Sequence, residues 1–201
     1  MKIGLIVEST SDGAEIKVLP HLLRMLDSSL LEKDIRVVAM TNKKDLIEAC
    51  GIAARNLLAE GCERVVIVWD LHPSYPTKGM PYCRFQERQS VLKTLSNAGI
   101  LENQPVYLLC IEKMLEAWLL ADERALNELL KPRKKLSLPK KPERELDPKS
   151  RLINLFEQNL GYKFVDSKHA IRIAQKLPDL QRLKKLETFK RFALKAIGKV
   201  L

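Results

Sequence analysis

The sequence predicts an α/β protein with a parallel-rich central sheet of about four strands, helices on both faces of the sheet, and a helical C-terminal region. Short apolar runs rich in β-branched residues alternate with segments whose apolar residues recur at helical spacing. Each link between the runs is long enough for a helical crossover, which parallel pairing requires. The chain has 201 residues, 46% of them hydrophobic and 30% charged, which suits a sizeable core and argues against disorder.

The expected strands are apolar runs bounded by polar residues or glycine, and they cover residues 3–8, 35–40, 65–69 and 106–111. Between them we expect a helix from Lys43 to Ala59, capped by Thr41 or Asn42, and a helix from Arg84 to Ala98. The helix after the first strand has two possible starts. Ser11 or Asp12 can cap it, or it begins near Pro20, which a first helical turn accepts.

The second half of the chain predicts helices without strands. One helix is expected from Glu112 to Leu130, where Pro132 stops it. The basic, proline-rich segment from Lys131 to Lys149 is expected to be an exposed linker or mobile loop. Helices then follow at about 152–160, 167–177 and 180–201. We therefore divide the chain into an α/β domain at 1–130, a linker at 131–149, and a helical region at 150–201 that is packed on the core or appended to it.

The net charge is +10, and most of the excess lies after Lys131. A basic half of this kind suggests a polyanionic partner, usually nucleic acid. Lys134 and Lys135 are candidates for backbone phosphate contacts, and the alternative is an ordinary solvated charge run. No apolar run approaches the roughly 18 to 20 residues that span a bilayer, and no export signal is evident, so we expect a cytoplasmic protein. The four cysteines form no metal-type pair and are expected to be small buried hydrophobes.

Acidic residues end two of the predicted strands, Glu8 the first and Asp70 the third. Because functional crevices of open α/β sheets lie at the carboxyl ends of the strands, these acids are expected to share one site, with Asp12 nearby. Clustered carboxylates bind Mg²⁺ and leave positions for water or phosphate oxygens. The alternative for each acid is a helix cap or a turn.

Two further acids and two arginines are candidates for the same edge. Glu112 lies where the fourth strand meets its helix, and Glu116 follows one helical turn later. Both are candidate metal ligands or, alternatively, favourable acids in a helix's first turns. Arg84 and Arg88 are one turn apart at a predicted helix start and are candidate phosphate contacts, together with Lys78 in the loop after Asp70. Trp118 is expected in the core.

The motifs IVESTSD, VVIVWD and IEKMLEAWLLAD resemble the Toprim fold of topoisomerases, primases and overcoming-lysogenization-defect nucleases. They are most similar to an uncharacterised bacterial Toprim-like family often found near defence or mobile genes. The resemblance implies that Glu8 acts as general acid/base or metal ligand and that Asp70 binds the metal, Mg²⁺ or Mn²⁺. Ser9 stands where the family usually has glycine, and His72 replaces its second aspartate. An imidazole at this position either shifts the preference towards Mn²⁺ or marks a weakened site.

These observations predict divalent-metal-dependent phosphoryl transfer on nucleic acid, most plausibly by a nuclease in a defence or mobile-element context. A second reading is a nucleic-acid-binding or regulatory module that keeps the fold without the chemistry. A third is an interaction subunit that holds a partner protein or a second copy through its C-terminal helices. The sequence has no P-loop, dinucleotide fingerprint, zincin motif or nucleophile elbow, which argues against those enzyme classes.

Overall fold

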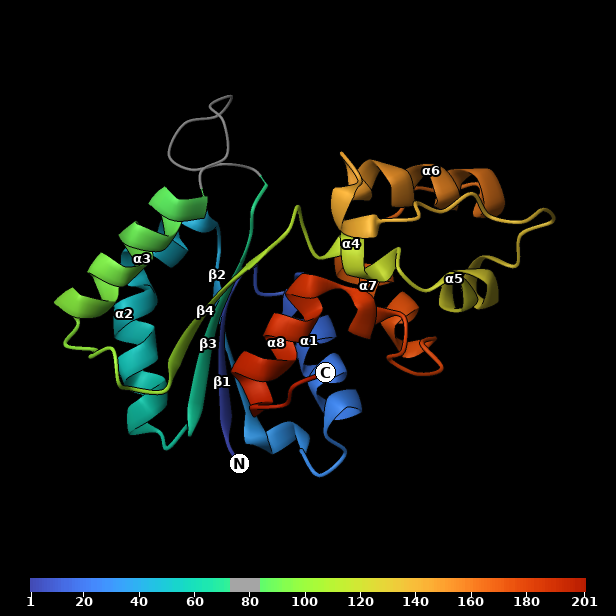
Figure 1. Ribbon diagram of the computed structural model, residues 1–201. Coiled ribbons are helices and arrows are strands. Elements are labelled where there is room, and N and C mark those ends of the chain that lie inside the picture. The colour runs from blue at the N-terminus through green and yellow to red at the C-terminus, as the bar shows by residue number, and fades with distance from the viewer. Residues whose placement is uncertain (73–83) are drawn as a thin grey trace.

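The computed structural model describes residues 1–72 and 84–201, and its described part contains one parallel sheet of four strands (Figure 1). The predicted α/β class and the parallel sheet are confirmed. The strand order β2-β1-β3-β4 places β1 and β3 in the centre and β4 at one edge. The strands are β1 (Ile3–Glu8), β2 (Ile35–Met40), β3 (Arg64–Asp70) and β4 (Val106–Ile111).

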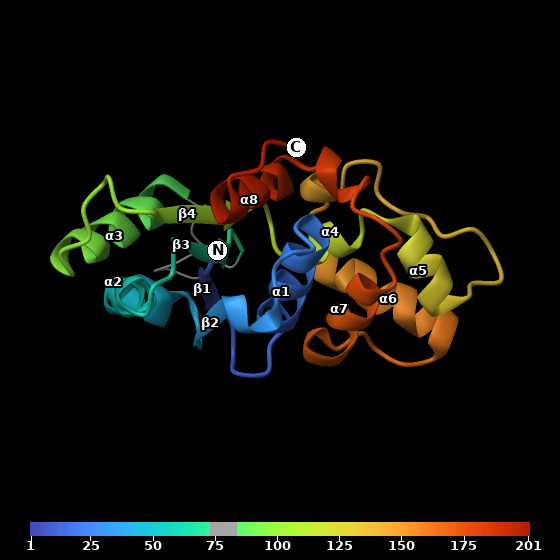
Figure 2. The same cartoon turned by 90° about the horizontal axis from the view of Figure 1, so that it is seen from below.

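Helices cover both faces of the sheet, as Figure 2 shows from below. Alternate residues of β1 point to opposite faces, so Leu5 packs with α1 (Glu15–Leu26) and α8 (Glu187–Ile197), while Ile6 packs with α2 (Lys43–Ala59) and α3 (Arg84–Asn97). Both residues are fully buried, as central strands of a doubly covered sheet require.

Helix α1 begins at Glu15, between the two expected starts, and Pro20 lies inside it. A proline here removes one intrahelical hydrogen bond. The helix tolerates the loss because it buries a full apolar stripe against the sheet. The buried residues are Val18, Leu19, Leu22, Leu23 and Leu26.

The single helix expected from Glu112 to Leu130 is wrong, because the structure has the short α4 (Glu116–Leu119) and then α5 (Glu123–Leu130). Asp122 separates them. Its side chain accepts a hydrogen bond from the backbone N–H of Arg124 at 2.9 Å and so caps α5. Arg124 also pairs with Asp179 at 2.8 Å, which ties this break to the C-terminal region.

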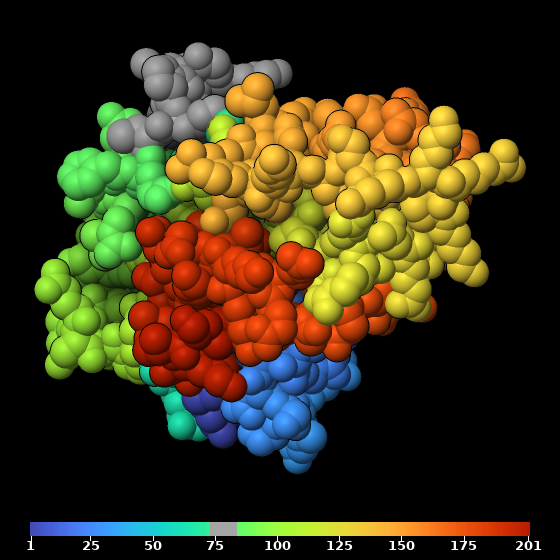
Figure 3. All heavy atoms as spheres, turned by 45° about the vertical axis from the view of Figure 1, so that its right-hand side comes forward, coloured from blue at the N-terminus to red at the C-terminus, as the bar shows by residue number. Residues whose placement is uncertain are grey.

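The segment 131–149 is partly exposed and crosses the surface seen in Figure 3, but it is also anchored. Leu136 and Pro142 are buried, and a 3₁₀ turn spans Pro142–Arg144. The carboxylate of Glu143 accepts backbone hydrogen bonds from Glu187 at 3.0 Å and Thr188 at 2.9 Å, so it satisfies the N-terminus of α8. An expectation of a simple exposed linker therefore fails for this part of the segment.

The C-terminal region packs on the sheet through α8, and α6 (Pro148–Leu160) and α7 (Asp166–Gln175) join the same hydrophobic core. A single helix over 180–201 is not found: a 3₁₀ turn at Leu183–Lys185 precedes α8. The apolar faces proposed for partner binding are largely used within the chain. No helix in the described ranges is long and apolar enough to cross a membrane.

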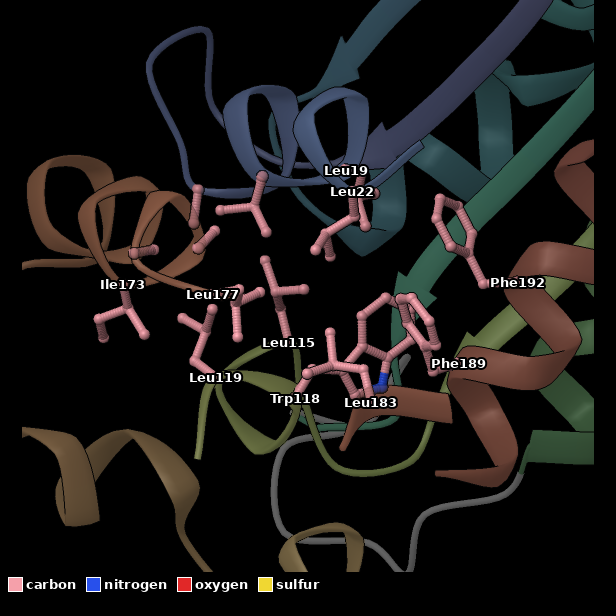
Figure 4. Close-up of a cluster of buried hydrophobic side chains, with 14 of the residues drawn as sticks. Leu19, Leu22, Leu115, Trp118, Leu119, Ile173, Leu177, Leu183, Phe189 and Phe192 are labelled. Carbon is pink, nitrogen blue, oxygen red and sulfur yellow. The ribbon is translucent and has the colours of Figure 1, made fainter. Parts of the chain in front are cut away.

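Trp118 lies at the centre of this core, as expected, and is fully buried (Figure 4). Its ring meets that of Phe189 edge-on, with centroids 5.2 Å apart, and that of Phe192 at 5.6 Å. Its indole N–H donates to the Thr188 hydroxyl at 2.8 Å, which satisfies the one polar atom that this burial removes from water. The EAWLLAD motif thus joins α4 to α8.

Truncation of Phe189 should show whether α8 belongs to one cooperative unit with the sheet. Phe189→Ala removes a fully buried ring and should lower the free energy of unfolding by about 3 to 5 kcal/mol in a single transition. Leu194→Ala, on the exposed side of the same helix, should cost much less. Urea unfolding followed by Trp fluorescence and circular dichroism measures both, and two separate transitions would contradict a shared core.

Candidate active site

The candidate site lies at the carboxyl ends of β1 and β3, where the structure brings Glu8 and Asp70 together. Val7 is in register with Val68, so Glu8 lies beside Trp69, one residue before Asp70 in β3. A hydrogen bond from the backbone of Asp70 acts on the Glu8 carboxylate, and the charge of Glu8 raises the pKa of Asp70. The two predicted strand-end acids therefore meet at one edge of the sheet.

Glu8 is half-buried, and its carboxyl group titrates near neutral pH. Burial raises the pKa of Glu8 to about 7, and the nearby Lys43 ammonium and the Asp70 backbone hydrogen bond offset part of that rise. Its Oε2 atom is buried and has no hydrogen-bond partner among the described residues. A buried oxygen in this state is expected to carry a proton or to meet a ligand. A carboxyl of this pKa can exchange a proton near neutral pH.

Asp70 belongs to a group of carboxylates on the α1 side of the strand ends. It shares the strand parity of Val66 and Val68, which pack in the core between the sheet and α1. Burial raises the pKa of Asp70 well above its usual value, and the charges of Glu15, Glu116 and Glu8 raise it further. Four carboxyl groups therefore repel one another around the end of β3.

Glu15 is held in this group by the turn that follows β1. The hydroxyl of the buried Ser9 donates to Oε2 of Glu15 at 2.6 Å. Gly13 leaves the space this contact needs, because a Cβ there would lie 2.0 Å from the Ser9 hydroxyl oxygen. Burial raises the pKa of Glu15, and the Ser9 hydrogen bond offsets part of the rise. Ser9 thus positions a second carboxylate near Asp70.

The C-terminal region supplies a cation to the same group. Lys149, in the first turn of α6, pairs with Asp166 in the first turn of α7, with 2.6 Å between Nζ and Oδ2. Burial raises the pKa of Glu116 to about 7, and the Lys149 ammonium lowers it in part, while the Glu15 carboxylate adds to the rise. Glu116 is 5% exposed, so most of its repulsion acts away from solvent.

A second buried pair supports Glu8 on the α2 side. Lys43 and Glu87 lie 3.1 Å apart between Nζ and Oε1, and both are almost fully buried. Glu87 also accepts the Trp69 indole N–H at 3.0 Å, and Lys43 donates to the carbonyl of Leu71 at 3.3 Å. Since Trp69 and Leu71 flank Asp70, this pair fixes the end of β3.

Sequence reasoning does not predict five residues of this site: Glu15, Lys43, Glu87, Lys149 and Asp166. An acid in the first turn after β1 is the available signal for Glu15. Lys43 follows the end of β2 and so lies at the same edge of the sheet as Glu8. Glu87, Lys149 and Asp166 come close only through tertiary packing, and no local pattern marks them.

The structure does not bring every predicted residue to the carboxylate group. Asp12 lies on an exposed turn and accepts from the Thr10 hydroxyl at 2.9 Å. Glu112 pairs with Arg84. The Nε2 atom of His72 lies 3.4 Å from the Lys113 ammonium, and the pKa of His72 is lowered by burial and by that charge. These neighbours do not favour His72 as a ligand of a cation shared with Asp70.

The remaining predicted contacts are basic. Lys134 and Lys135 line a hollow of about 780 Å³ between the 131–137 segment and α6, together with Arg151. Arg88 is exposed on α3, and Lys78 lies outside the described residues. Both hollow-lining lysines are therefore available for anions, in a place separate from the carboxylates.

The carboxylate oxygens at this edge are of the type that binds divalent cations, but they do not form a complete coordination shell. No three His, Cys, Asp or Glu side chains in residues 1–72 and 84–201 are arranged to hold a metal directly. Mg²⁺ commonly takes one or two carboxylates and keeps several waters. By strand parity Glu8 lies on the α2 face and Asp70 on the α1 face, so an ion shared by the two would have to lie beyond the strand ends. Bringing a cation here would also relieve the carboxylate repulsion.

No family model, curated protein or solved structure matches this chain. The Toprim resemblance therefore stays a prediction from the motifs, and the chemistry of the site is argued from its geometry alone.

The burial of Glu116, to which the Glu15 charge adds, predicts a pH-dependent stability. The pKa of Glu116 is about 7 in the folded protein, against 4.5 for an ordinary carboxyl. At low pH the group is protonated in both the folded and the unfolded state and does not affect stability. As the pH rises between these two values, the unfolded state ionises more readily, so the free energy of unfolding falls. Glu116→Gln should therefore raise the free energy of unfolding by about 1 to 2 kcal/mol more at about pH 8 than at about pH 5.

Urea unfolding at the two pH values measures the effect. The exposed Glu48→Gln on α2 removes the same charge and should leave the pH dependence of the wild type unchanged. An equal change in both variants would mean that burial does not raise the pKa of Glu116.

Proposed function

We propose that this protein is a divalent-metal-dependent phosphoryl-transfer enzyme acting on nucleic acid, with phosphodiester hydrolysis as its reaction. The observation that carries the proposal is the unsatisfied, buried Oε2 of Glu8 beside the carboxylate group of Asp70, Glu15 and Glu116. Burying a polar oxygen without a partner lowers the stability of the fold. Carboxyl groups with strongly raised pKa values are common at functional sites.

Asp70 and the free oxygen of Glu8 would hold Mg²⁺ or Mn²⁺. When bound, such an ion polarises a phosphoryl oxygen and lowers the pKa of water. Glu116, whose pKa is about 7, would exchange a proton with the attacking or leaving oxygen. Ser9 would hold Glu15 in place by its hydrogen bond. Lys149, held by its ion pair with Asp166, would keep a positive charge near Glu116.

A binding module without catalysis is the second candidate. The absence of a closed three-ligand group in the described residues and the Lys113 contact of His72 favour it. It shares the basic surfaces with the first candidate and differs in needing no metal. Cytoplasmic location is part of either proposal: Cys50, Cys62 and Cys110 are free thiols, as a reducing compartment would keep them.

Metal-dependent cleavage should require Glu8. Incubation of wild type with Mg²⁺ or Mn²⁺ and labelled single- or double-stranded DNA and RNA should yield shorter products on denaturing gels. Glu8→Gln should lower the rate by about 100-fold or more, as expected when a ligand of the catalytic cation loses its charge. Glu48→Gln serves as the matched control for the loss of one glutamate charge.

Thermal unfolding with and without the metal provides a second readout. Millimolar Mg²⁺ or Mn²⁺ should raise the melting temperature of wild type and not that of Glu8→Gln. Equal product from wild type and Glu8→Gln would remove the catalytic proposal. Binding without product or metal stabilisation would leave the non-catalytic module.

A further inference from the structure

A basic groove runs along the free edge of β4, between α3 and α8. Figure 2 shows β4 between these two helices, and in Figure 3 they lie on the same face of the molecule. Arg84 and Arg88 come from α3, and Arg191 and Lys195 come from α8. These four cations line a hollow of about 100 Å³ over Trp69 and residues 108–110. A larger hollow of about 770 Å³ continues past Arg88 and Lys195 towards Lys93.

Lys195 closes the edge of β4 against another strand. The carbonyl of Pro105 accepts a hydrogen bond from β3, and that of Ile111 accepts one from Leu71. Carbonyls of odd-numbered residues in β4 therefore face β3, and the carbonyl of Leu108 faces away from the sheet. The ammonium of Lys195 donates to this outward carbonyl at 2.8 Å. An edge strand that a helix covers in this way is closed to strand addition. The groove therefore does not suit a partner that adds a β-strand.

Among the described residues, an acidic side chain forms an ion pair with only one of the four groove cations, Arg84. Glu112 pairs with Arg84, while Arg88 and Arg191 make no ion pair with any residue in the described ranges. Nε of Arg84 is buried and has no hydrogen-bond partner there. Burial lowers the pKa of Lys195, and the charges of Arg88 and Arg191 lower it further, which shows that the cations are close enough to repel one another. An anion in the groove would relieve this repulsion.

The groove begins at the carboxylate edge of the sheet. Glu112 follows directly after the last residue of β4, so its partner Arg84 marks the end of the groove nearest Asp70. Lys195 reaches the middle of β4, at Leu108. The row of cations thus leads from the strand ends along β4.

We propose that this groove binds successive phosphates of a nucleic-acid strand and guides the strand to the carboxylate edge, with Arg191 and Lys195 of α8 as contacts that add to Arg84 and Arg88. Arginine forks match phosphate oxygens in pairs, and a row of cations matches a row of phosphates. The inference deepens the proposed function, because it names the path of that substrate. Binding itself needs no metal and no cleavage.

Removal of two cations tests the groove in the presence of EDTA, so that no cleavage occurs. Fluorescence anisotropy with labelled single- and double-stranded DNA and RNA oligonucleotides should give about tenfold or more weaker binding for Arg88→Ala/Arg191→Ala than for wild type at about 0.1 M salt. The slope of log K against log salt should fall by about 1.4 to 1.8, as two phosphate contacts predict. Both arginines are exposed, so the variant should fold, and circular dichroism checks this.

Lys33→Ala/Lys44→Ala is the matched control. It removes two exposed positive charges outside the groove and should leave the salt slope of the wild type unchanged. Equal binding by the two double variants, or no nucleic-acid binding by wild type, would overturn the groove. Binding of polyglutamate as tight as that of the oligonucleotides would overturn its assignment to phosphates.

The outcome is separable from that of the proposed chemistry. Groove-dependent binding without cleavage would keep the groove and remove the nuclease. Cleavage by wild type, together with unchanged binding by Arg88→Ala/Arg191→Ala, would keep the nuclease and remove the groove.

Discussion

Desolvation of the carboxyl groups around the end of β3, together with the repulsion among them, is the constraint on which the rest of the site depends. Parallel strands deliver their carboxyl ends to one edge, so Glu8 and Asp70 are neighbours by topology. Burial denies them the solvation that would screen their charges. The surrounding contacts then have one shared effect, which is to hold in place groups that would otherwise separate or take up protons.

The C-terminal region contributes both to the hydrophobic core and to the electrostatics of the site. Lys149 brings a positive charge to Glu116 and Glu15 because α6 and α7 pack beside α4. α6 and α7 keep their place through the same hydrophobic cluster that contains Trp118 and α8. Glu143 then caps α8 from the intervening segment. Loss of this packing would remove the Lys149 charge from the carboxylates. The stability of the helical region and the electrostatics of the site are therefore linked.

The sequence predicts the sheet well because each strand is an apolar run whose burial is set locally, and Glu8 and Asp70 are read from the ends of such runs. It predicts the second half poorly. The break at Asp122 depends on a side-chain cap and on the distant Asp179, and neither changes the helical spacing of leucines around it. Asp12 illustrates the reverse error. It stands close to Glu8 along the chain, yet the turn at Ser9 and Gly13 points Glu15 towards the site and leaves Asp12 exposed.

The Arg84–Glu112 pair lies where the negative edge and the positive groove meet. Without a ligand, Glu112 is the acid that partly balances the groove, and its pairing keeps it out of the carboxylate group around Asp70. A phosphate at this end would compete with Glu112 for the guanidinium of Arg84, whose buried Nε has an unused donor. The carboxylate so displaced would lie beside the arriving phosphate, and their repulsion disfavours that arrangement unless a divalent cation bridges the two. Under the proposed function, phosphate entry at Arg84 and cation binding at the strand ends would favour each other.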